Sequence, residues 1–407
     1  MIEEKDGIGV KQPDDGLTPE QRRYLEIVKA EREKNGGRRP EYGDSKSPKK
    51  RTRNILDHDD RDVKKKKKSS KVIVAIICLL IIAICFGLLA WLYFSKMVSK
   101  LDTVKTIDKE FEVNKTVERQ LSGYRNVAIL GSDGRMGEGF DGTRTDAIII
   151  ARIHKKSGKI HLISVMRDSY LEIRDSNGQK KLDKITHAHA FGGGVDTCAS
   201  LNRSLDLNIS EFLIFSWQSV ADLVDAMGGV DVEIRSEELA DLERYGYETA
   251  RNVGKTYEPV YQPGKQTLDG VQAATYCRIR KTSGGDPGRG RRMKAVLKSL
   301  VQKAKEKSIS DLNKVADKVF PEIRTNITKS GILNTLTKVG SYKIDKSYGW
   351  PKEYYGGILN GTWYTVPKTL DSQVKYLHKK AFGQKTYNLT ERAEKINDKI
   401  IEQTGVE

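Results

Sequence analysis

One uninterrupted apolar segment constrains this chain more than any other feature. Residues 72–94 (VIVAIICLLIIAICFGLLAWLYF) carry no charged side chain. An α-helix of this length rises about 35 Å, which exceeds the roughly 30 Å of a bilayer's hydrocarbon core. About seventy mostly polar residues precede the segment, whereas a cleaved signal peptide lies at the extreme N-terminus. The sequence therefore predicts one retained transmembrane helix, a signal anchor.

Basic residues flank the N-terminal side of this apolar segment. Lys64–Lys68 and Lys71 stand directly before it, and a second basic run occupies Lys49–Arg53. The positive-inside rule predicts that residues 1–71 lie in the cytoplasm and that the chain after Lys96 lies outside, as in a single-pass type II protein of the cell membrane. The lysine cluster is expected to bind anionic lipid headgroups, at about 1 kcal/mol per charge. No helix-turn-helix or aromatic interleaving accompanies the charge, so no nucleic-acid partner is expected.

Composition divides the chain into five expected parts. They are a cytoplasmic basic and mostly disordered segment (1–71), the transmembrane helix (72–94), a membrane-proximal stalk (95–123), one globular domain (124–382) and a polar C-terminal tail (383–407). One short helix is expected in the first part, over residues 19–34 with Thr18 as its N-cap. The whole chain has a formal net charge of +17, and the part expected outside is basic too. A basic exterior part suits an anionic substrate or an anionic cell wall.

Short apolar runs in the globular domain predict a sheet. Five runs with strand character are 126–130, 147–153, 160–165, 212–215 and 230–234. Two stretches have apolar residues at helical spacing: 218–227, which ends at Gly228 and Gly229, and 291–307. The expected fold class is therefore α/β, a mixed sheet covered by helices.

Arginines gather late in this domain, in the run YCRIRKTSGGDPGRGRRM. The run holds Arg278, Arg280, Asp286, Arg289, Arg291 and Arg292. If residues 276–280 form a strand, Arg278 and Arg280 point from one face, because side chains alternate. Guanidinium groups grip phosphate oxygens in a fork, and each charge-assisted bond is worth roughly 1.5 to 3 kcal/mol. The run indicates a phosphate clamp, with a solvated basic face as the alternative.

Seven motifs occur in order behind the apolar segment. They are NVAILGSDGR, GTRTDAIIIARI, LISVMRDSYLEI, DKITHAHAFGG, LVDAMGGVDVEI, GKQTLDGVQAATYCRIR and GDPGRGRRM. Over roughly residues 124–382 they resemble the motifs of the LytR-CpsA-Psr family. The resemblance implies a membrane-anchored phosphotransferase of a Gram-positive-type envelope. Such enzymes take a glycopolymer, such as teichoic acid or capsule polysaccharide, from a polyprenyl diphosphate and join it to peptidoglycan through a phosphodiester, usually at the 6-hydroxyl of N-acetylmuramic acid.

The chemistry expected outside a membrane agrees with that implication. No ATP is available there, and the chain contains neither a P-loop nor a G-x-G-x-x-G placed before a helix. The substrate must therefore bring its own activated bond, as a lipid-linked diphosphate does. Its transfer requires neutralisation of phosphate charge, a divalent metal and an aligned hydroxyl.

The resemblance also implies roles for individual residues. Asp133 and Asp146 match aspartates associated with the metal, Mg²⁺ or Mn²⁺. The residues implied to bind the diphosphate are Arg144, Arg167, Lys184, Arg278, Arg280 and Arg289. Asp286 is implied to position an arginine or to accept the proton of the acceptor hydroxyl, and Asp133 is the other candidate for this general base.

One departure from the family's pattern keeps other functions open. The family has glutamine after an arginine near the start of the long helix, and this chain has Met293 after Arg292. Methionine is a poor hydrogen-bond partner for phosphate, so either a neighbour such as Arg292 takes over or the substrate preference or rate has changed. A non-catalytic envelope regulator or lipid-carrier binder, and a hydrolase of the same diphosphate, are the alternatives.

Three further features have two interpretations each. His187 and His189 form an H-x-H pair, but no third ligand stands at a familiar spacing, so a zinc site is disfavoured. Cys198 and Cys277 could form a disulfide in an oxidising exterior, which sequence cannot establish. Residues 209–224 or 291–307 could line an apolar groove for a polyprenyl chain, or could be ordinary core.

Overall fold

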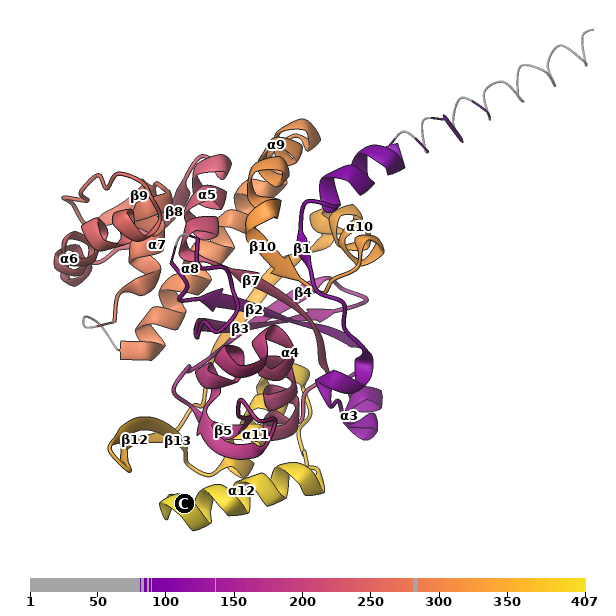
Figure 1. Ribbon diagram of the computed structural model, residues 1–407, viewed down its shortest axis with the longest axis vertical. Coiled ribbons are helices and arrows are strands. Elements are labelled where there is room, and N and C mark those ends of the chain that lie inside the picture. Colours follow the sequence, from indigo (N-terminus) through magenta and orange to yellow (C-terminus); the bar gives the residue numbers. More distant parts are fainter. Residues whose placement is uncertain (1–80, 82–83, 86–87, 89, 136, 281–284) are drawn as a thin grey trace, which may run out of the picture. The chain divides into compact units, whose positions relative to one another are not determined.

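The computed structural model of the protein describes residues 81, 84, 85, 88, 90–135, 137–280 and 285–407 (Figure 1). The segment predicted to be cytoplasmic, 1–71, lies outside these residues together with its lysine cluster and short helix. Most of the predicted transmembrane helix lies outside them too. Within the described part of the chain, no helix is both long enough and apolar enough to cross a membrane.

The described elements alternate between strands and helices. The strands are β1 (Asp102–Thr103), β2 (Tyr124–Ser132), β3 (Thr145–His154), β4 (Lys159–Val165), β5 (Tyr170–Arg174), β6 (Lys180–Lys184), β7 (Ile209–Phe215), β8 (Val230–Ile234), β9 (Gly264–Leu268), β10 (Ile323–Thr325), β11 (Lys343–Trp350), β12 (Tyr354–Leu359) and β13 (Thr362–Pro367). The α-helices are α3 (Lys115–Gln120), α4 (Ile185–Leu205), α5 (Trp217–Met227), α6 (Ser236–Asn252), α7 (Gly270–Arg278), α8 (Gly285–Glu306), α9 (Ile309–Val319), α10 (Lys329–Thr337), α11 (Leu370–Leu377) and α12 (Glu391–Thr404). Four short turns of other helix types are η1 (Asp108–Phe111), η2 (Phe320–Glu322), η3 (Val339–Ser341) and η4 (His378–Phe382).

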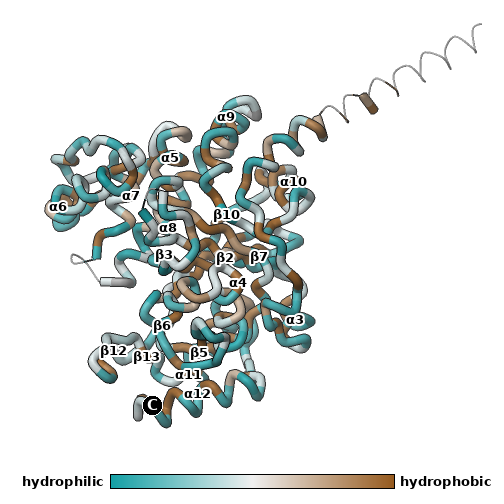
Figure 2. The backbone as a smooth tube through the Cα atoms, viewed as in Figure 1, coloured by the Kyte–Doolittle hydropathy of each residue, from teal (hydrophilic) through white to brown (hydrophobic). Residues whose placement is uncertain are grey.

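A central mixed sheet confirms the predicted fold class. Among the described residues, its seven strands have the order β1-β10-β7-β2-β3-β4-β11. The pairs β1 with β10, β7 with β2, and β4 with β11 are parallel, and the other neighbours are antiparallel. Four predicted strands lie within β2, β3, β4 and β7, and the fifth is β8, which pairs with β9 outside the central sheet. Figure 2 shows hydrophobic residues gathered in this sheet and hydrophilic residues on the outer helices.

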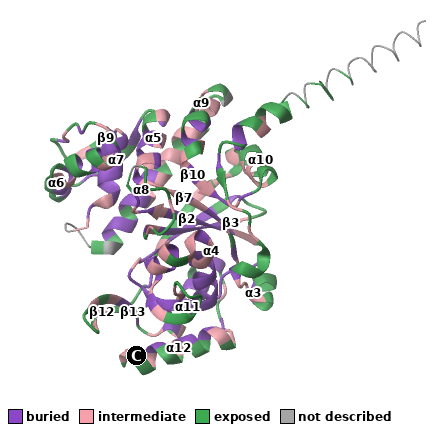
Figure 3. Ribbon diagram, viewed as in Figure 1, coloured by how far each residue is buried: buried purple, intermediate pink, exposed green. Residues whose placement is uncertain are grey.

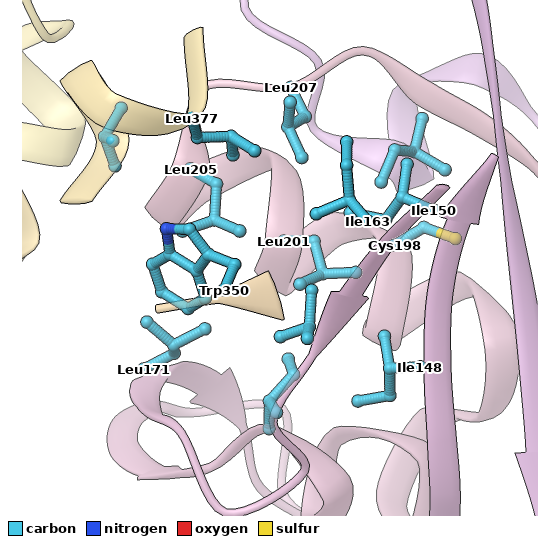
Figure 4. Close-up of a cluster of buried hydrophobic side chains, with 14 of the residues drawn as sticks. Ile148, Ile150, Ile163, Leu171, Cys198, Leu201, Leu205, Leu207, Trp350 and Leu377 are labelled. Carbon is cyan, nitrogen blue, oxygen red and sulfur yellow. The ribbon is translucent and has the colours of Figure 1, made fainter. Parts of the chain in front are cut away.

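Helices cover both faces of the sheet. On β3, Ile148 and Ile150 pack into one cluster, which includes α4, α11 and α12, while Ile149 and Ala151 face a second cluster with α5, α7 and α8. This alternation follows from the period of two along a strand. Trp350 at the end of β11 is fully buried in the first cluster (Figure 4). Figure 3 shows many buried residues in the central strands and in α4.

Two expected domain boundaries are wrong. Residues 95–123 were expected to be a stalk, but Phe111, Val117 and Leu121 are buried in the first cluster. Residues 383–407 were expected to be a polar tail, but α12 buries Ile396 and Ile400 in the same cluster. Each segment has few apolar residues, yet their i, i+4 spacing places them on one helix face, and the charged outer face dominates the composition.

Glu112 joins the two ends of the domain. It follows η1 in the left-handed conformation, with φ 47°. Its carboxylate accepts hydrogen bonds from Arg174, from Arg203 at 3.1 Å and from Lys180 at 3.2 Å, and its backbone oxygen accepts one from Arg392 of α12 at 2.9 Å. Burial raises the pKa of the Glu112 carboxyl, but Arg203 and its neighbours outweigh burial, and the net pKa is lowered. One carboxylate thus connects η1 with β5, β6 and α4.

The strand expected at residues 276–280 is wrong, because α7 continues to Arg278. Asp269 caps this helix by accepting from the Gln272 backbone at 2.8 Å, and the Gln272 side chain accepts from the Asp269 backbone at 3.0 Å. Ala273 and Cys277, four residues apart, are both buried on the core face. Helical geometry therefore sends Arg278 and Arg280 in different directions.

The two cysteines for which a disulfide was considered, Cys198 and Cys277, are free thiols. Cys198 lies in the first cluster and Cys277 in the second, and both are buried. Burial raises the pKa of the Cys277 thiol to about 12, which makes it an inert core residue. The structure contains no disulfide between them.

Candidate active site

The candidate site lies at one end of the β3–β4 pair. The register pairs Ile148 with Val165, so the preceding Asp146 stands opposite the residues that follow β4, Arg167 and Asp168. The start of α8 brings Arg289 to the same place, and the segment after α7 brings Arg280. Residues more than a hundred positions apart in sequence therefore share one site.

Asp146 is the first centre of this site. One carboxylate oxygen accepts a hydrogen bond from Arg167, and the other accepts from Arg289 Nη2 at 2.8 Å. Burial raises the pKa of the Asp146 carboxyl, but the charges of Arg289 and Arg167 outweigh it and lower the pKa to about 2. Asp146 is therefore an anion at every physiological pH.

Arg289 is the most buried cation of the site, with 3% of its surface exposed. Its Nε donates to the backbone oxygen of Cys277 at 3.3 Å, and its guanidinium lies 5.9 Å from the centre of the Trp217 ring. Its Nη1 has no hydrogen-bond partner among the described residues. A buried N–H without an acceptor is costly, so this atom offers a donor for an anionic ligand.

Asp168 is a second centre, which the sequence prediction missed. Its carboxylate lies 3.3 Å from Lys184 Nζ, 3.6 Å from Arg167 Nε and 3.7 Å from Arg280 Nη2. Four cationic side chains therefore share the two carboxylates Asp146 and Asp168. The excess of positive charge at a half-buried position suits a ligand with more than one negative charge.

Asp133 and Arg144 close the loop between β2 and β3. Asp133 Oδ1 accepts from the Arg144 backbone N–H at 2.8 Å, and the Asp133 N–H donates to the Arg144 backbone oxygen at 2.9 Å. The Arg144 side chain is 58% exposed, and its Nε lies 3.5 Å from Asp133 Oδ2. Arg144 is consequently able to turn toward a ligand.

The carboxylates of Asp133 and Asp146 have the donor chemistry that Mg²⁺ prefers. Each already has an arginine beside it, so cationic side chains compensate their charge in this structure. In the described part of the chain, no group of three or more His, Cys, Asp or Glu side chains could hold a metal by itself. An ion at either carboxylate would have to take its remaining ligands from water and phosphate.

The histidine pair does not form a metal site. His187 and His189 lie in the first turns of α4 rather than on a strand, and they bond to different groups. His187 Nδ1 lies 3.0 Å from Asp183, while His189 Nδ1 donates to the Thr143 backbone oxygen at 2.7 Å. The buried position of His189 lowers its pKa, so its ring is neutral.

Other predicted residues lie elsewhere or are not described. Arg278 donates to Thr249 Oγ1 and Glu248 Oε1 of α6, each at 2.7 Å. Arg292 is fully buried, with Glu238 Oε1 at 3.0 Å from its Nη1, and this contact favours the other alternative for Met293, a changed substrate preference or rate. Asp286 belongs to the first turn of α8, and its side chain is outside the described part of the chain.

Two adjoining cavities meet beside the arginines. The first, of about 30 Å³, is lined by Asp146, Arg167 and Arg289. The second, of about 100 Å³, is apolar and is lined by Phe215, Trp217, Val220, Leu223, Val296, Leu297 and Leu300. Ala147, Ile149 and Met293 line both. Among the apolar residues that line only the second cavity, those from Phe215 to Leu223 and from Val296 to Leu300 come from the two segments in which a lipid groove was expected, 209–224 and 291–307.

Several known proteins are similar to this chain in sequence or in fold. A polyisoprenyl-teichoic acid–peptidoglycan teichoic acid transferase TagU from Enterococcus faecalis is 30% identical over 291 residues, which are 66% of this chain and 88% of that protein. A structure of TagT bound to LI-WTA has a TM-score of 0.51 at 22% identity and covers 65% of this chain and 91% of its own. The crystal structure of protein gbs0355 from Streptococcus agalactiae has a TM-score of 0.56 at 23% identity, with 68% and 93% covered. The LytR_cpsA_psr family matches residues 90–380. The chain therefore belongs to the LytR-CpsA-Psr family.

Proposed function

We propose that this protein is a membrane-anchored phosphotransferase. It moves an anionic or capsular glycopolymer from a polyprenyl diphosphate carrier onto peptidoglycan, through a phosphodiester bond. The observation that carries the proposal is that Arg167 and Arg289 line a cavity that shares Met293 with an apolar one. Two further cations, Lys184 and Arg280, join Arg167 at Asp168. A lipid diphosphate has these two properties in one molecule, a doubly charged head and an apolar chain.

The charges of the site support binding of a diphosphate. Arg289 is buried and presents an unpartnered N–H, and guanidinium groups bind phosphate oxygens more strongly where water is excluded. Arg167 and Arg280 neutralise charge on the leaving phosphate as the bond to the transferred phosphate breaks. Asp146 and Asp168 keep these side chains at the site before a ligand arrives.

The apolar cavity supports binding of the carrier chain. Its lining side chains come from α5 and α8, and Met293 stands between the cavity and the arginines. Methionine at this position, in place of glutamine, extends the apolar surface toward the charged cluster. The sequence difference that left a regulator open is thus compatible with lipid binding and turnover.

Asp133 and Asp146 are the residues that would hold Mg²⁺ or Mn²⁺. When bound there, the ion supplies positive charge to the phosphoryl oxygens. Arg144, which is mostly exposed, would follow Asp133 toward the same oxygens. The general base that accepts the proton of the acceptor hydroxyl is proposed to be Asp286 or Asp133.

The proposed location follows from the N-terminal sequence. The apolar segment 72–94 anchors the chain in the cell membrane, with the lysine cluster on the cytoplasmic side against anionic lipid and the catalytic domain outside. A lipid diphosphate presents its phosphates at the bilayer surface, where an anchored domain can reach them.

The test is transfer by the full-length protein in detergent. A short polyprenyl diphosphate glycan, Mg²⁺ and peptidoglycan oligomers are supplied, and the products are identified by mass spectrometry. The wild type is expected to join glycan phosphate to peptidoglycan, whereas Arg280→Ala and Asp146→Ala abolish the product. Arg119→Ala, which removes an exposed arginine of α3, is the matched control.

Each alternative function gives a different result in this assay. Release of glycan phosphate into water, with or without peptidoglycan, indicates a hydrolase. Binding of the lipid without any product, across several glycans and metals, indicates a carrier-binding or regulatory protein. Either result refutes the proposed transferase.

A further inference from the structure

An exposed aromatic face lies on the hairpin of β12 and β13. The register pairs Ile358 with Trp363 and Tyr354 with Pro367, so these side chains share one face of the two-stranded ribbon. On that face Tyr354 is 37% exposed, Ile358 68% and Trp363 52%. Exposed apolar side chains that lie together in this way mark a binding site more often than apolar side chains scattered singly over a surface.

Glycine makes this face flat. Gly356 lies between Tyr354 and Ile358, and a Cβ added to it would stand 2.9 Å from the Trp363 ring. The indole therefore lies over the backbone of Gly356, with its outer face open to solvent. A broad ring lying flat on a strand is a surface for stacking, in contrast to a groove that encloses a ligand.

The outer edge of β13 and the opposite face of the hairpin both contact the candidate active site. Thr365 donates from its backbone N–H to the backbone oxygen of Asp168 at 2.9 Å, and the Tyr364 hydroxyl lies 3.2 Å from Asp183. Lys184 Nζ lies 5.5 Å from the centre of the Tyr364 ring. Trp363, next to Tyr364 in sequence, is therefore held close to the cationic cluster and faces away from the core.

We propose that the face formed by Tyr354, Gly356, Ile358 and Trp363, the hairpin face, binds the sugars of the acceptor glycan strand. Pyranose rings present an apolar face of C–H groups that stacks on aromatic rings, while their hydroxyl and acetamido groups stay in water or bond to the Tyr hydroxyl and Trp N–H. The identification of the glycan as the acceptor rests on the proposed function.

The position of the hairpin favours a glycan over a lipid surface. The hairpin follows β11, which is one edge of the central sheet, whereas the chain from the apolar N-terminal segment joins the sheet at β1, the other edge. The residues around the N-terminal connection, such as Met97 and Val98, pack with α5 and α9. The hairpin instead contacts Asp168 of the cationic cluster through Thr365, and the acceptor of a phosphoryl group has to be brought to that cluster.

Glycan binding is tested first without catalysis. The full-length protein in detergent is titrated with a chito-oligosaccharide and with soluble peptidoglycan strands, by calorimetry and by tryptophan fluorescence. The wild type is expected to bind with a saturable change in fluorescence. Trp363→Ala is expected to weaken binding at least tenfold, and Trp363→Phe to retain most of it.

Two further variants separate the hairpin face from general effects. Gly356→Ala removes no aromatic group but displaces the Trp363 ring, so it is expected to weaken binding as well. Tyr261→Ala removes another exposed aromatic side chain, 81% exposed, and is expected to bind normally. Unchanged binding by both Trp363→Ala and Gly356→Ala refutes the proposal. Two other results also refute the proposal. One is that the hairpin face binds anionic vesicles and no glycan. The other is that the wild type forms a dimer and Trp363→Ala is a monomer.

The catalytic readout distinguishes this proposal from the proposed function. In the transfer assay Trp363→Ala is expected to raise the KM for peptidoglycan about tenfold while the KM for the lipid diphosphate stays constant. If the wild type transfers nothing but still binds glycan through Trp363, the transferase is wrong and the hairpin face stands. If transfer occurs and Trp363→Ala leaves the peptidoglycan KM unchanged, the hairpin face is wrong and the transferase stands.

Discussion

Replacing Asp146 by Asn removes one charge and almost no volume, so it measures what the carboxylate does for its two arginines. A fall in pKa from the ordinary 3.8 to about 2 corresponds to about 2 kcal/mol of net stabilisation of the ionised form. The folded-state pKa is depressed, so this stabilisation is present above pH 3.8 and is lost as the pH falls through 2. Asp146→Asn is expected to lower the free energy of unfolding by about 2 kcal/mol at pH 7, with the difference vanishing near pH 2.

The same substitution should change anion binding in the opposite direction. Asp146 occupies N–H groups of Arg167 and Arg289 that a diphosphate would use. Without metal, Asp146→Asn is therefore expected to bind inorganic pyrophosphate more tightly than wild type, by up to about thirtyfold if the full 2 kcal/mol is released. With Mg²⁺ the order should reverse, because the variant has lost a metal ligand.

Urea unfolding between pH 2 and pH 7 and calorimetry with pyrophosphate, in EDTA and in Mg²⁺, measure these effects. Asp398→Asn, on the exposed face of α12, is the matched control for loss of a carboxylate. Equal stability of Asp146→Asn and wild type at pH 7, together with equal pyrophosphate affinity in EDTA, would show that the carboxylate does not hold the arginines. The account of the site would then be wrong.

Three other substitutions test separate parts of the structure. Burial lowers the pKa of Lys294 to about 8, so between pH 8 and 10.5 the unfolded chain binds more protons than the folded one. The free energy of unfolding therefore rises with pH over that range. Relative to Lys294→Met, the wild type should gain up to about 3 kcal/mol between these pH values, measured by urea unfolding. Arg280→Ala should reduce transfer at least a hundredfold, whereas Arg278→Ala, whose partners lie on α6, should reduce it less than tenfold, measured by product mass spectrometry. Val296→Trp fills the apolar cavity and should raise the KM about tenfold for a long-chain carrier but little for a short-chain one, measured by initial rates.

The strands that are buried on both faces of the sheet were predictable from the sequence. The strands β2, β3 and β4 consist of short β-branched stretches, and these need no distant information to be recognised. The strand expected at residues 276–280 was wrong because charged and uncharged side chains alternate in Cys-Arg-Ile-Arg as they do in a strand. The capping pair Asp269 and Gln272, together with the spacing of Ala273 and Cys277, indicated the helix.

The site was predictable only in part. The family resemblance named Asp146, Arg167 and Arg289, which the structure brings together. Asp168 was missed because its partners Lys184 and Arg280 come from distant segments, and an Arg-Asp dipeptide alone looks like a surface ion pair. Where each arginine points depends on helix phase, which no local pattern within the run 276–293 established.

The bridge through Glu112 has a consequence for the order in which the chain becomes native during synthesis. Its carboxylate, early in the domain, is bonded to α4, and its backbone oxygen is bonded to Arg392, which is 280 residues further along the chain. The first cluster likewise needs Ile396 and Ile400 to be complete. A ribosome must therefore make the chain at least as far as Ile400 before this core can close, and contacts between segments so far apart in sequence form slowly. Until then the part of the domain that has been made lacks a complete core.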